Sequence, residues 1–301
     1  REVIREPPNR IPPFPPGLPF RMRRAVSPHV EMLATVLFWA GNFSATKMAL
    51  PYIPPLAFTA IRFTIGTGLL WLILRRLEPE HALAPGLGRT LLLLGVVGNT
   101  IYQLCFISGL AVTTAVNTSL ILSAMPAVVT VTAGVLGLEV ITSRQRWGLA
   151  LATVGVIVVV ASRGLALGHG SWRGGLLILA AVGCWTAYTL GLRRISGRVS
   201  ALGVTAWTML TGTPGLILAG LPELSRTAWH EVPATAWGGL VYSTLLSLVA
   251  AYILWSRAVQ RIGASRAALY TCVTPLFATL IAMAVLGERP TLWHLAGGIL
   301  I

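Results

Sequence analysis

The sequence predicts an all-α polytopic membrane protein, built from ten transmembrane helices as two inverted five-helix repeats. Three observations lead to this fold class. Hydrophobic residues make up 55% of the chain and charged residues only 11%, and a soluble domain carries about twice that charged fraction. Apolar runs of about 18 or more residues, each long enough to cross the hydrocarbon core of a bilayer, recur along the chain. The chain also repeats itself after 149 residues.

Residues 1–28 precede the first apolar run and are rich in proline. Seven prolines between Pro7 and Pro19 oppose a helix and favour an extended chain. The segment also lacks the apolar h-region of a signal peptide. We therefore expect residues 1–28 to form a disordered tail on the cytoplasmic side.

Ten apolar segments follow. They cover residues 30–49, 55–76, 89–110, 114–137, 146–162, 173–193, 200–221, 234–256, 265–286 and 292 onward. The last is short, because ten residues rise only about 15 Å in a helix, and we expect the natural protein to continue past Ile301. The first repeat is expected over residues 29–163, and the second over residues 172–301 with its last helix truncated.

The internal repeat pairs identical residues across the two halves. Ala115 falls on Ala264, Leu120 on Leu269, Pro126 on Pro275, Thr130 on Thr279, Glu139 on Glu288, Thr142 on Thr291 and Gly148 on Gly297. Five segments repeat as five segments, and an odd number makes the second copy enter the membrane from the opposite side. Inverted repeats are typical of alternating-access carriers, whose solute site lies near the bilayer midplane.

The distribution of Arg residues predicts the orientation. Arg residues gather in the tail and in every second connection, and positively charged connections stay in the cytoplasm. The connection between segments three and four carries no charge, whereas its repeat mate holds Arg257 and Arg261. The N-terminus is therefore expected in the cytoplasm. One Lys against 22 Arg suggests a high-GC bacterial gene, hence a multi-pass protein of the bacterial inner (cell) membrane.

Several other classes of protein are disfavoured. The net charge of +14 does not indicate nucleic-acid binding, because the arginines lie in short clusters rather than on one domain face. Cys105, Cys184 and Cys272 fall inside apolar runs without CxxC spacing, so neither disulfides nor a metal site is expected. The sequence contains no set of catalytic motifs, so we expect no enzyme activity and no cofactor. The expected partners are a small-molecule solute and the lipid bilayer, with the chain a monomer or a homodimer.

Three stretches resemble the ten-span EamA-type permeases of the drug/metabolite transporter superfamily. The run LFWAGNFSATKMALPYIPPLAFTAIRF resembles the first hairpin of that family, and the runs AVNTSLILSAMPAVVTVTAGVLGLE and GASRAALYTCVTPLFATLIAMAVLGERPTLWHLAGG resemble its fourth and ninth spans. The resemblance covers residues 30–301. It implies a bundle with a central cavity lined mainly by spans one, three, four, six, eight and nine, and transport of amino acids, drugs, sugars or other metabolites.

Polar and aromatic side chains inside the segments are the candidates for solute binding. They are Trp39, Asn42, Asn99, Gln103, Ser123, Trp185, Tyr188, Ser247, Tyr270 and Thr274. For each of them, hydrogen bonding between helices or simple packing is the alternative. Pro126 and Pro275 occupy matching positions and are candidate hinges, with a static kink as the alternative.

The charged residues inside the segments are expected to have mainly structural roles. An intramembrane Arg is a functional candidate by default, but we expect Arg62 to pair with a backbone carbonyl or a Glu on a peripheral helix. Lys47 either extends to the membrane surface or faces the cavity. Glu139 and Glu288 lie at the membrane edge. Because no Asp occurs in the chain and no Glu or His is evident in the middle of a segment, a facilitator without proton coupling is favoured, with coupling through an unidentified site as the alternative.

These features together predict a secondary transporter that works by alternating access. The expected solute is a small neutral or zwitterionic metabolite, such as an amino acid or a related compound, moved outward by analogy with the family. The alternatives are an exporter of drugs or lipophilic cations, and a non-transport membrane scaffold.

Overall fold

The computed structural model describes residues 26–79, 86–137, 143, 147, 151, 154 and 171–288. Within these ranges the regular elements are all helical, apart from an isolated bridge between Ser196 and Val199. The predicted tail and the predicted segments at residues 146–162 and from residue 292 lie almost wholly outside the described residues. The all-helical fold class is therefore confirmed, while the expected number of ten helices stays a prediction.

The first half of the chain begins with two continuous helices and continues with two interrupted ones. The elements are α1 (Pro28–Ala49), α2 (Pro55–Leu77), α3 (Gly88–Gly95), the π-helix η1 (Val96–Ile101), α4 (Tyr102–Ala111), α5 (Ala115–Leu122) and α6 (Met125–Val135). Segment three is thus α3, η1 and α4 in succession, and segment four is α5 followed by α6.

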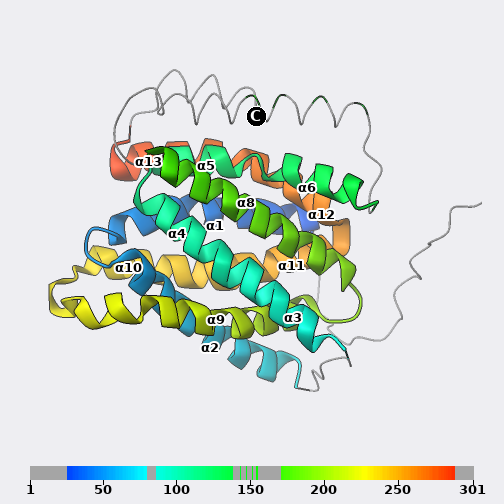
Figure 1. The fold of residues 1–301 in the computed structure, drawn as a ribbon, viewed down its shortest axis with the longest axis horizontal. Coiled ribbons are helices and arrows are strands. Elements are labelled where there is room, and N and C mark those ends of the chain that lie inside the picture. Colours follow the sequence, from blue (N-terminus) through cyan, green and yellow to red (C-terminus); the bar gives the residue numbers. More distant parts are fainter. Residues whose placement is uncertain are drawn as a thin grey trace, which may run out of the picture.

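The second half repeats this order. Its elements are α8 (Ser171–Arg194), α9 (Ala201–Arg226), the 3-10 turn η2 (Trp229–Glu231), α10 (Ala234–Tyr242), the π-helix η3 (Ser243–Ala250), α11 (Ala251–Ile262), α12 (Ala264–Leu269), the 3-10 turn η4 (Tyr270–Val273) and α13 (Thr274–Leu286). Both halves carry a π-helix in the third described segment and a tight break in the fourth. Figure 1 shows the helices side by side as a bundle along the long axis of the molecule.

Two helices extend further than the sequence predicted. The segment expected to end at residue 221 continues to Arg226 through Pro214 and Pro222, because membrane helices tolerate proline where neighbours satisfy the freed backbone groups. The segment expected to end at residue 256 continues as α11 to Ile262. Arg257 and Arg261 therefore lie on a helix and not in a connection.

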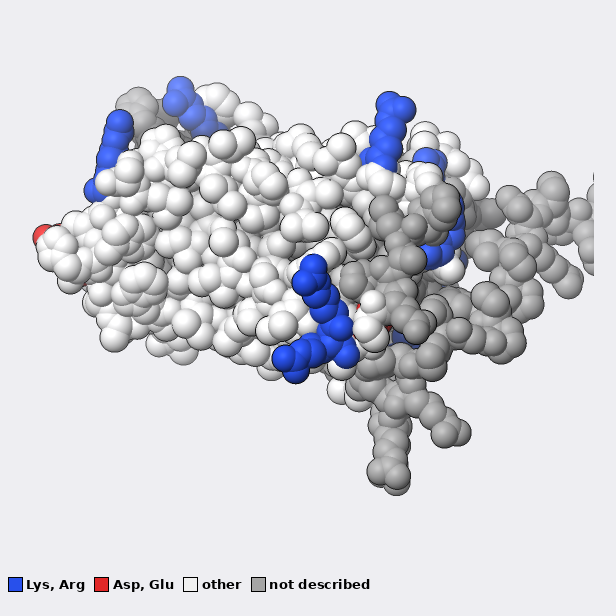
Figure 2. Space-filling model, turned by 90° about the horizontal axis from the view of Figure 1, so that it is seen from below, with Lys and Arg blue, Asp and Glu red and all other residues white. Residues whose placement is uncertain are grey.

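Among the residues that the structure describes, seven helical stretches are long and apolar enough to cross a membrane. They are Pro55–Leu77, Gly88–Ala111, Asn117–Val135, Trp172–Arg194, Ala201–Arg226, Ala234–Ile262 and Arg266–Leu286. α1 is 22 residues long but less apolar. Its polar residues Asn42, Ser44 and Thr46 are buried, so its composition reflects contacts inside the bundle. In the face drawn in Figure 2, broad surfaces carry no charged side chain.

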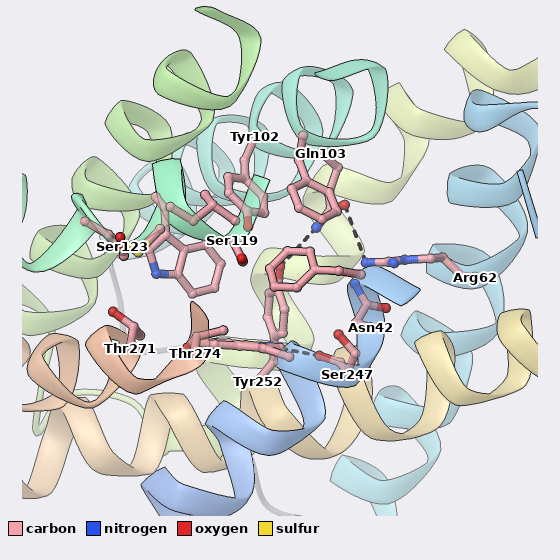
Figure 3. A pocket seen from close by; sticks show the side chains of 16 residues that line it. Asn42, Arg62, Tyr102, Gln103, Ser119, Ser123, Ser247, Tyr252, Thr271 and Thr274 are labelled. Atoms are coloured by element: carbon pink, nitrogen blue, oxygen red, sulfur yellow. Dashed lines mark hydrogen bonds between the residues drawn. The ribbon is translucent and has the colours of Figure 1, made fainter. Parts of the chain in front are cut away.

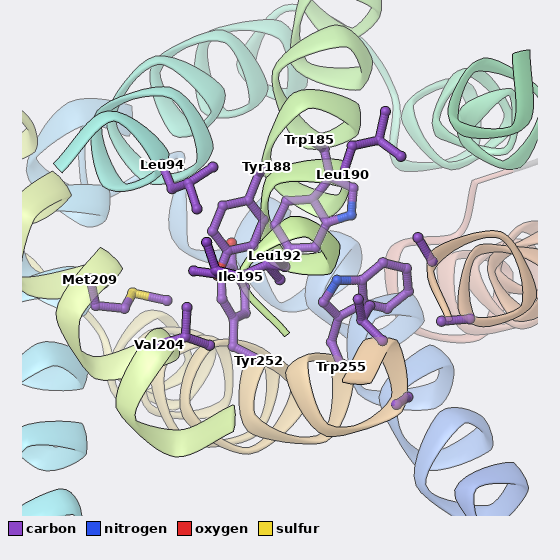
Figure 4. Packing of buried hydrophobic residues seen from close by; sticks show 14 of the residues in the cluster. Leu94, Trp185, Tyr188, Leu190, Leu192, Ile195, Val204, Met209, Tyr252 and Trp255 are labelled. Carbon is purple, nitrogen blue, oxygen red and sulfur yellow. The ribbon is translucent and has the colours of Figure 1, made fainter. Parts of the chain in front are cut away.

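Packing links the two halves throughout the bundle. α2 packs along α9, α1 packs on α10, η3, α11 and α13, and α8 packs on η1, α4, α5 and α6. The largest buried cluster lies between the halves. Figure 4 shows Trp185 and Tyr188 of α8 against Tyr252 and Trp255 of α11, with Leu94 and Met209 beside them.

The two ends of the bundle differ in their ion pairs. At the end where α1 begins, which we call the Glu31 end, the buried Glu31 carboxylate lies 2.7 Å from the Arg257 guanidinium and 3.2 Å from that of Arg261. At the other end, which we call the Lys47 end, Lys47 interacts electrostatically with Glu288. Glu288 Oε1 also accepts a hydrogen bond of 3.2 Å from the backbone N–H of Ala115, at the start of α5. The ion pairs of Glu31 thereby hold the start of α1 to α11.

Glycine permits the closest helix contacts. A Cβ at Gly212 of α9 would lie 2.5 Å from the carbonyl oxygen of Gly95 in α3, and a Cβ at Gly239 of α10 would overlap the carbonyl oxygen of Ala45 in α1. Lipid provides no hydrophobic driving force between helices. Small residues at such crossings therefore stabilise the bundle by letting the helices pack closely.

Gly239→Ala is expected to lower the free energy of unfolding by about 1–3 kcal/mol, because overpacking forces α1 and α10 apart. The neighbouring Gly238→Ala is the matched control, since a Cβ there meets nothing within 4 Å. Thermal unfolding of both variants in detergent, followed by tryptophan fluorescence, measures the difference. Equal midpoints for the two variants would contradict the α1–α10 contact.

Candidate functional site

A cavity lies between the two halves, near the midpoints of the helices that surround it. About 590 Å³ of space lies between its atoms, a figure that includes open solvent. Its lining residues come from α1, α2, α4, α5, α6, α8, η3, α11, η4 and α13, including the turns between them (Figure 3). They are Trp39, Asn42, Phe43, Arg62, Tyr102, Gln103, Phe106, Ser119, Leu122, Ser123, Met125, Trp185, Ser247, Tyr252, Thr271 and Thr274.

Most of the candidate solute-binding residues meet in this cavity. Seven of the ten line it, namely Trp39, Asn42, Gln103, Ser123, Trp185, Ser247 and Thr274. They belong to the spans that the family resemblance implied, one, three, four, six, eight and nine. The structure therefore brings these side chains together, and their binding of a solute stays a prediction.

The structure places the other three candidates away from the cavity. Asn99 lies in η1 with 0% of its surface exposed, and its side-chain amide has no hydrogen-bond partner among the described residues. The Tyr188 hydroxyl lies 3.3 Å from the Thr208 hydroxyl inside the core. The Tyr270 hydroxyl is hydrogen-bonded to the ring Nδ1 of His29, at the Glu31 end.

One side of the cavity carries a chain of hydrogen bonds that crosses four spans. Asn42 Oδ1 accepts a bond of 2.5 Å from the Ser243 hydroxyl, and that hydroxyl accepts one of 2.6 Å from Arg62 Nη1. Arg62 Nη2 donates to Gln103 Oε1 at 3.4 Å, and Gln103 Nε2 donates to the Tyr252 hydroxyl at 3.2 Å (Figure 3). Because lipid offers polar groups no partners, these side chains satisfy one another.

The other side of the cavity is aromatic. The Trp39 ring contacts that of Trp185 edge to face, with centroids 5.6 Å apart, and lies 6.4 Å from that of Tyr252. Tyr102 lies 5.0 Å from Trp185 and stacks on Phe106 at 5.9 Å. The Trp39 Nε1–H donates to the Ser247 carbonyl oxygen at 3.2 Å, which fixes the ring. Such rings offer apolar surface and faces that attract cations.

Arg62 differs from the sequence expectation. It is 2% exposed, it lines the cavity, and its hydrogen-bond partners are the side chains of Ser243 and Gln103. The expected pairing with a backbone carbonyl or a Glu was therefore wrong within the described residues. α2 is also not peripheral at this point, because it packs on η3 and α9. The signal was present in the sequence, since an Arg in the middle of an apolar segment marks a functional site by default.

The sequence also gave no indication of four apolar lining residues. Phe43, Phe106, Leu122 and Met125 line the cavity but look like ordinary core residues in the sequence. Two of them could have been found from the repeat, because Leu122 and Met125 lie 149 residues before two other lining residues. Those residues are Thr271 and Thr274.

The paired prolines follow breaks in their spans, beside the cavity. α5 ends at Leu122 and α6 begins at Met125, so Pro126 stands in the first turn of α6. Pro275 stands likewise in the first turn of α13, directly after the 3-10 turn η4. A proline in a first helical turn leaves no hydrogen bond unmade, so neither break is caused by a missing donor within the helix that follows it. The role of either proline as a hinge stays a prediction.

Comparison with known proteins identifies the family. The sequence model of the EamA-like transporter family matches residues 29–161 and again residues 172–301. The chain belongs to the EamA-like transporter family. Its two matches to one family confirm that two related units follow one another in this chain. The described apolar helices of this EamA-like transporter make it a multi-pass membrane protein.

Relatives of this EamA-like chain are named as transporters. The uncharacterized transporter YyaM of Bacillus subtilis is 25% identical over 91% of this chain and 90% of its own length. A probable amino-acid metabolite efflux pump of Salmonella typhimurium is 25% identical over 89% of this chain and 90% of its own. A crystal structure of another protein has the same fold, with a TM-score of 0.67 and 18% identity over 91% of this chain and 93% of its own.

Asn99→Leu is expected to leave solute flux unchanged and to keep or raise the free energy of unfolding, because a buried amide without a partner costs about 1–3 kcal/mol. Gln103→Leu, one turn further along the same span, is the contrasting variant and is expected to lower flux. Flux through proteoliposomes and thermal unfolding measure the two effects. If Asn99→Leu lost flux while its stability was unchanged, the result would indicate that Asn99 belongs to the solute site.

Proposed function

We propose that this EamA-like protein is a secondary transporter that carries a small neutral or zwitterionic metabolite, an amino acid or a related compound, outward across the bacterial inner membrane. The observation that carries the proposal is the cavity between the two halves, where a polar chain faces an aromatic wall. Polar groups would hold the α-carbon substituents of an amino acid, and the rings would hold its side chain. The relationship to an amino-acid metabolite efflux pump supports the same solute class.

The rival solute class is a drug or a lipophilic cation. Among the described residues, the cavity contains one charged side chain, that of Arg62. A cation would therefore meet positive charge with no carboxylate to offset it, so the cavity favours neutral, zwitterionic or anionic solutes.

We further propose that the two halves are inverted repeats that exchange access to the cavity. Equivalent helices run in opposite directions where contacts fix their ends. Glu223 Oε2, near the end of α9, accepts bonds of 2.7 and 2.9 Å from the backbone N–H groups of Leu56 and Ala57 at the start of α2. At the opposite end, Glu78 Oε2 accepts a bond of 2.5 Å from Ser200, which precedes α9. α2 and α9 are thus antiparallel neighbours.

α1 and its counterpart α8 also run in opposite directions. α1 begins at the Glu31 end, whereas α8 begins at the Lys47 end, where Gly174 packs on Gly109 and Thr113. The Gln103–Tyr252 hydrogen bond joins residues 149 positions apart. Two equivalent residues can touch only near the axis that relates the halves, which supports a pseudo-twofold axis through the cavity and alternating access around it.

Arginine placement supports a cytoplasmic Glu31 end. Arg75, Arg76, Arg89, Arg193, Arg194, Arg198, Arg257, Arg261 and Arg266 lie in or beside helix ends at that end of the bundle, against Lys47, Arg173 and Arg226 at the other. This is the bias expected of cytoplasmic connections.

The orientation can be measured in intact cells. In a chain freed of its three cysteines, a membrane-impermeant thiol reagent is expected to label His230→Cys, in the connection after α9, from outside. Arg198→Cys, in the connection before α9, should react only after the cells are permeabilised, and both positions are exposed. The reverse pattern would invert the proposed orientation, and labelling of both from outside would contradict a single span in α9.

Transport is tested with proteoliposomes preloaded with a mixture of amino acids and related metabolites, whose retained contents are read by mass spectrometry against empty vesicles. Selective loss of a few compounds is expected. The double variant Asn42→Ala, Thr274→Ala should slow that loss about two- to tenfold, because removing one or two hydrogen bonds to the solute has an effect of this size. Ser44→Ala is the matched control, because Ser44 is buried in the same helix but does not line the cavity.

An imposed pH gradient on the same vesicles tests coupling. Flux is expected to be independent of the gradient, because no Asp, Glu or His lines the cavity among the described residues. Strict dependence on the gradient would contradict a facilitator. No selective loss from folded protein in either condition would contradict the proposed function.

A further inference from the structure

The geometry points to Arg62 as the binding group for a carboxylate on the transported solute. This inference rests on the proposed function, because it names the chemical class of that solute. In the part of the chain that the structure describes, the positive charge of Arg62 is not balanced by a neighbouring negative charge. Arg62 is 2% exposed, about seven residues into a span, and within the described chain its guanidinium makes no ion pair.

The neighbours of Arg62 satisfy it only in part. Ser243 accepts a good hydrogen bond of 2.6 Å, but the bond to Gln103 is long, at 3.4 Å, and Nε has no partner among the described residues. The rings of Phe58 and Phe63 lie 5.9 and 5.4 Å from the guanidinium carbon. None of these groups carries a negative charge. A buried cation without a counter-ion is costly, and that cost is removed when an anion binds.

The cavity gives an anion access to this cation. Arg62 is in its wall, beside Asn42 and Gln103 (Figure 3), and the other described lining residues are uncharged. A guanidinium presents its N–H groups in a planar fork that matches a carboxylate. Because the wall offers one positive charge, it suits a monocarboxylate better than a doubly charged phosphate. The carboxylate would take the place of the weakly held Gln103 oxygen.

The rest of the wall then indicates what the carboxylate is attached to. The rings of Trp39, Tyr102, Trp185 and Tyr252 also line the cavity, and they suit an apolar or aromatic body. The amino group of an amino acid would meet ring faces and neutral oxygens, since the described wall has no acidic side chain. The carboxylate is therefore the required group, and the amine is an optional one.

Matched pairs of probes separate the two groups. The full-length protein in detergent is titrated with L-phenylalanine, L-leucine and L-alanine, with their amides, and with 3-phenylpropanoate. Binding is read by calorimetry and by quenching of Trp39 and Trp185. We expect at least one of the amino acids to bind ten or more times more tightly than its amide, since hydrogen bonds to charged groups are the stronger ones. If the cavity accepts an aromatic body, 3-phenylpropanoate is expected to bind as well.

Variants of Arg62 test its part in that preference. Arg62→Gln should weaken binding of the acid at least tenfold and leave binding of the amide unchanged, and Arg62→Lys should keep part of the preference. Thr67→Val is the matched control, because Thr67 is buried in the same helix, bonds to Thr213 and does not line the cavity. If Arg62→Gln does not fold, Arg62→Lys and the probe pairs on the unaltered protein carry the test.

The outcomes distinguish this inference from the proposed function. It is overturned if no acid binds more tightly than its amide, or if Arg62→Gln weakens acid and amide equally, as a purely structural role would. Transport of solutes that have no carboxylate would support the proposed transport function and contradict the role of Arg62 as a carboxylate-binding group. Acid-selective binding that depends on Arg62, in a protein that shows no flux, would support the carboxylate-binding role of Arg62 and contradict the proposed transport function.

Discussion

Lipid around the helices offers no hydrogen bonds, and this constraint arranges the rest of the structure. A polar side chain within a span is stabilised by a partner inside the bundle or by access to an aqueous cavity; among the described residues Asn99 is an exception, because it has neither. Asn42, Arg62 and Gln103 therefore converge on the interior, although they come from three different helices. Their mutual bonds hold α1, α2 and α4 to η3. The cavity is the part of this polar interior that the side chains leave unfilled.

The central helix of this arrangement is α1. It packs on the helices of the second half along its length, and the ion pairs of Glu31 hold its start to α11. Trp39 and Asn42 project from its middle into the cavity. In an exchange of access, a helix held by partners in the other half would move with that half or exchange those contacts. The buried Glu31 pair lies outside the cavity and suits an end contact better than a solute site.

Departures from ideal helix recur at matching places in both halves. The π-helices η1 and η3 occupy the third described span of each half, and breaks precede Pro126 and Pro275 in the fourth. A π-helix widens the turn and often marks a functional site, and a break exposes backbone groups where lipid is absent. The deformed stretches η3 and η4 contribute cavity residues directly, namely Ser247 and Thr271, so one side of the irregular backbone borders the protein interior.

The sequence by itself determined the membrane-protein class, most helix bounds, the internal repeat and the family, because hydropathy, proline spacing and charge bias are properties of local sequence. It also named seven residues that share one cavity, since large polar groups in apolar spans have few other places to be. Only the tertiary structure decided which polar residues satisfy one another. Asn99 and Gln103 lie four residues apart in one span, yet only Gln103 reaches the cavity. The wider turn of the π-helix η1 changes the direction in which the residues after it point. Likewise, only the packing of α2 between α9 and η3 placed Arg62 in the wall of the cavity.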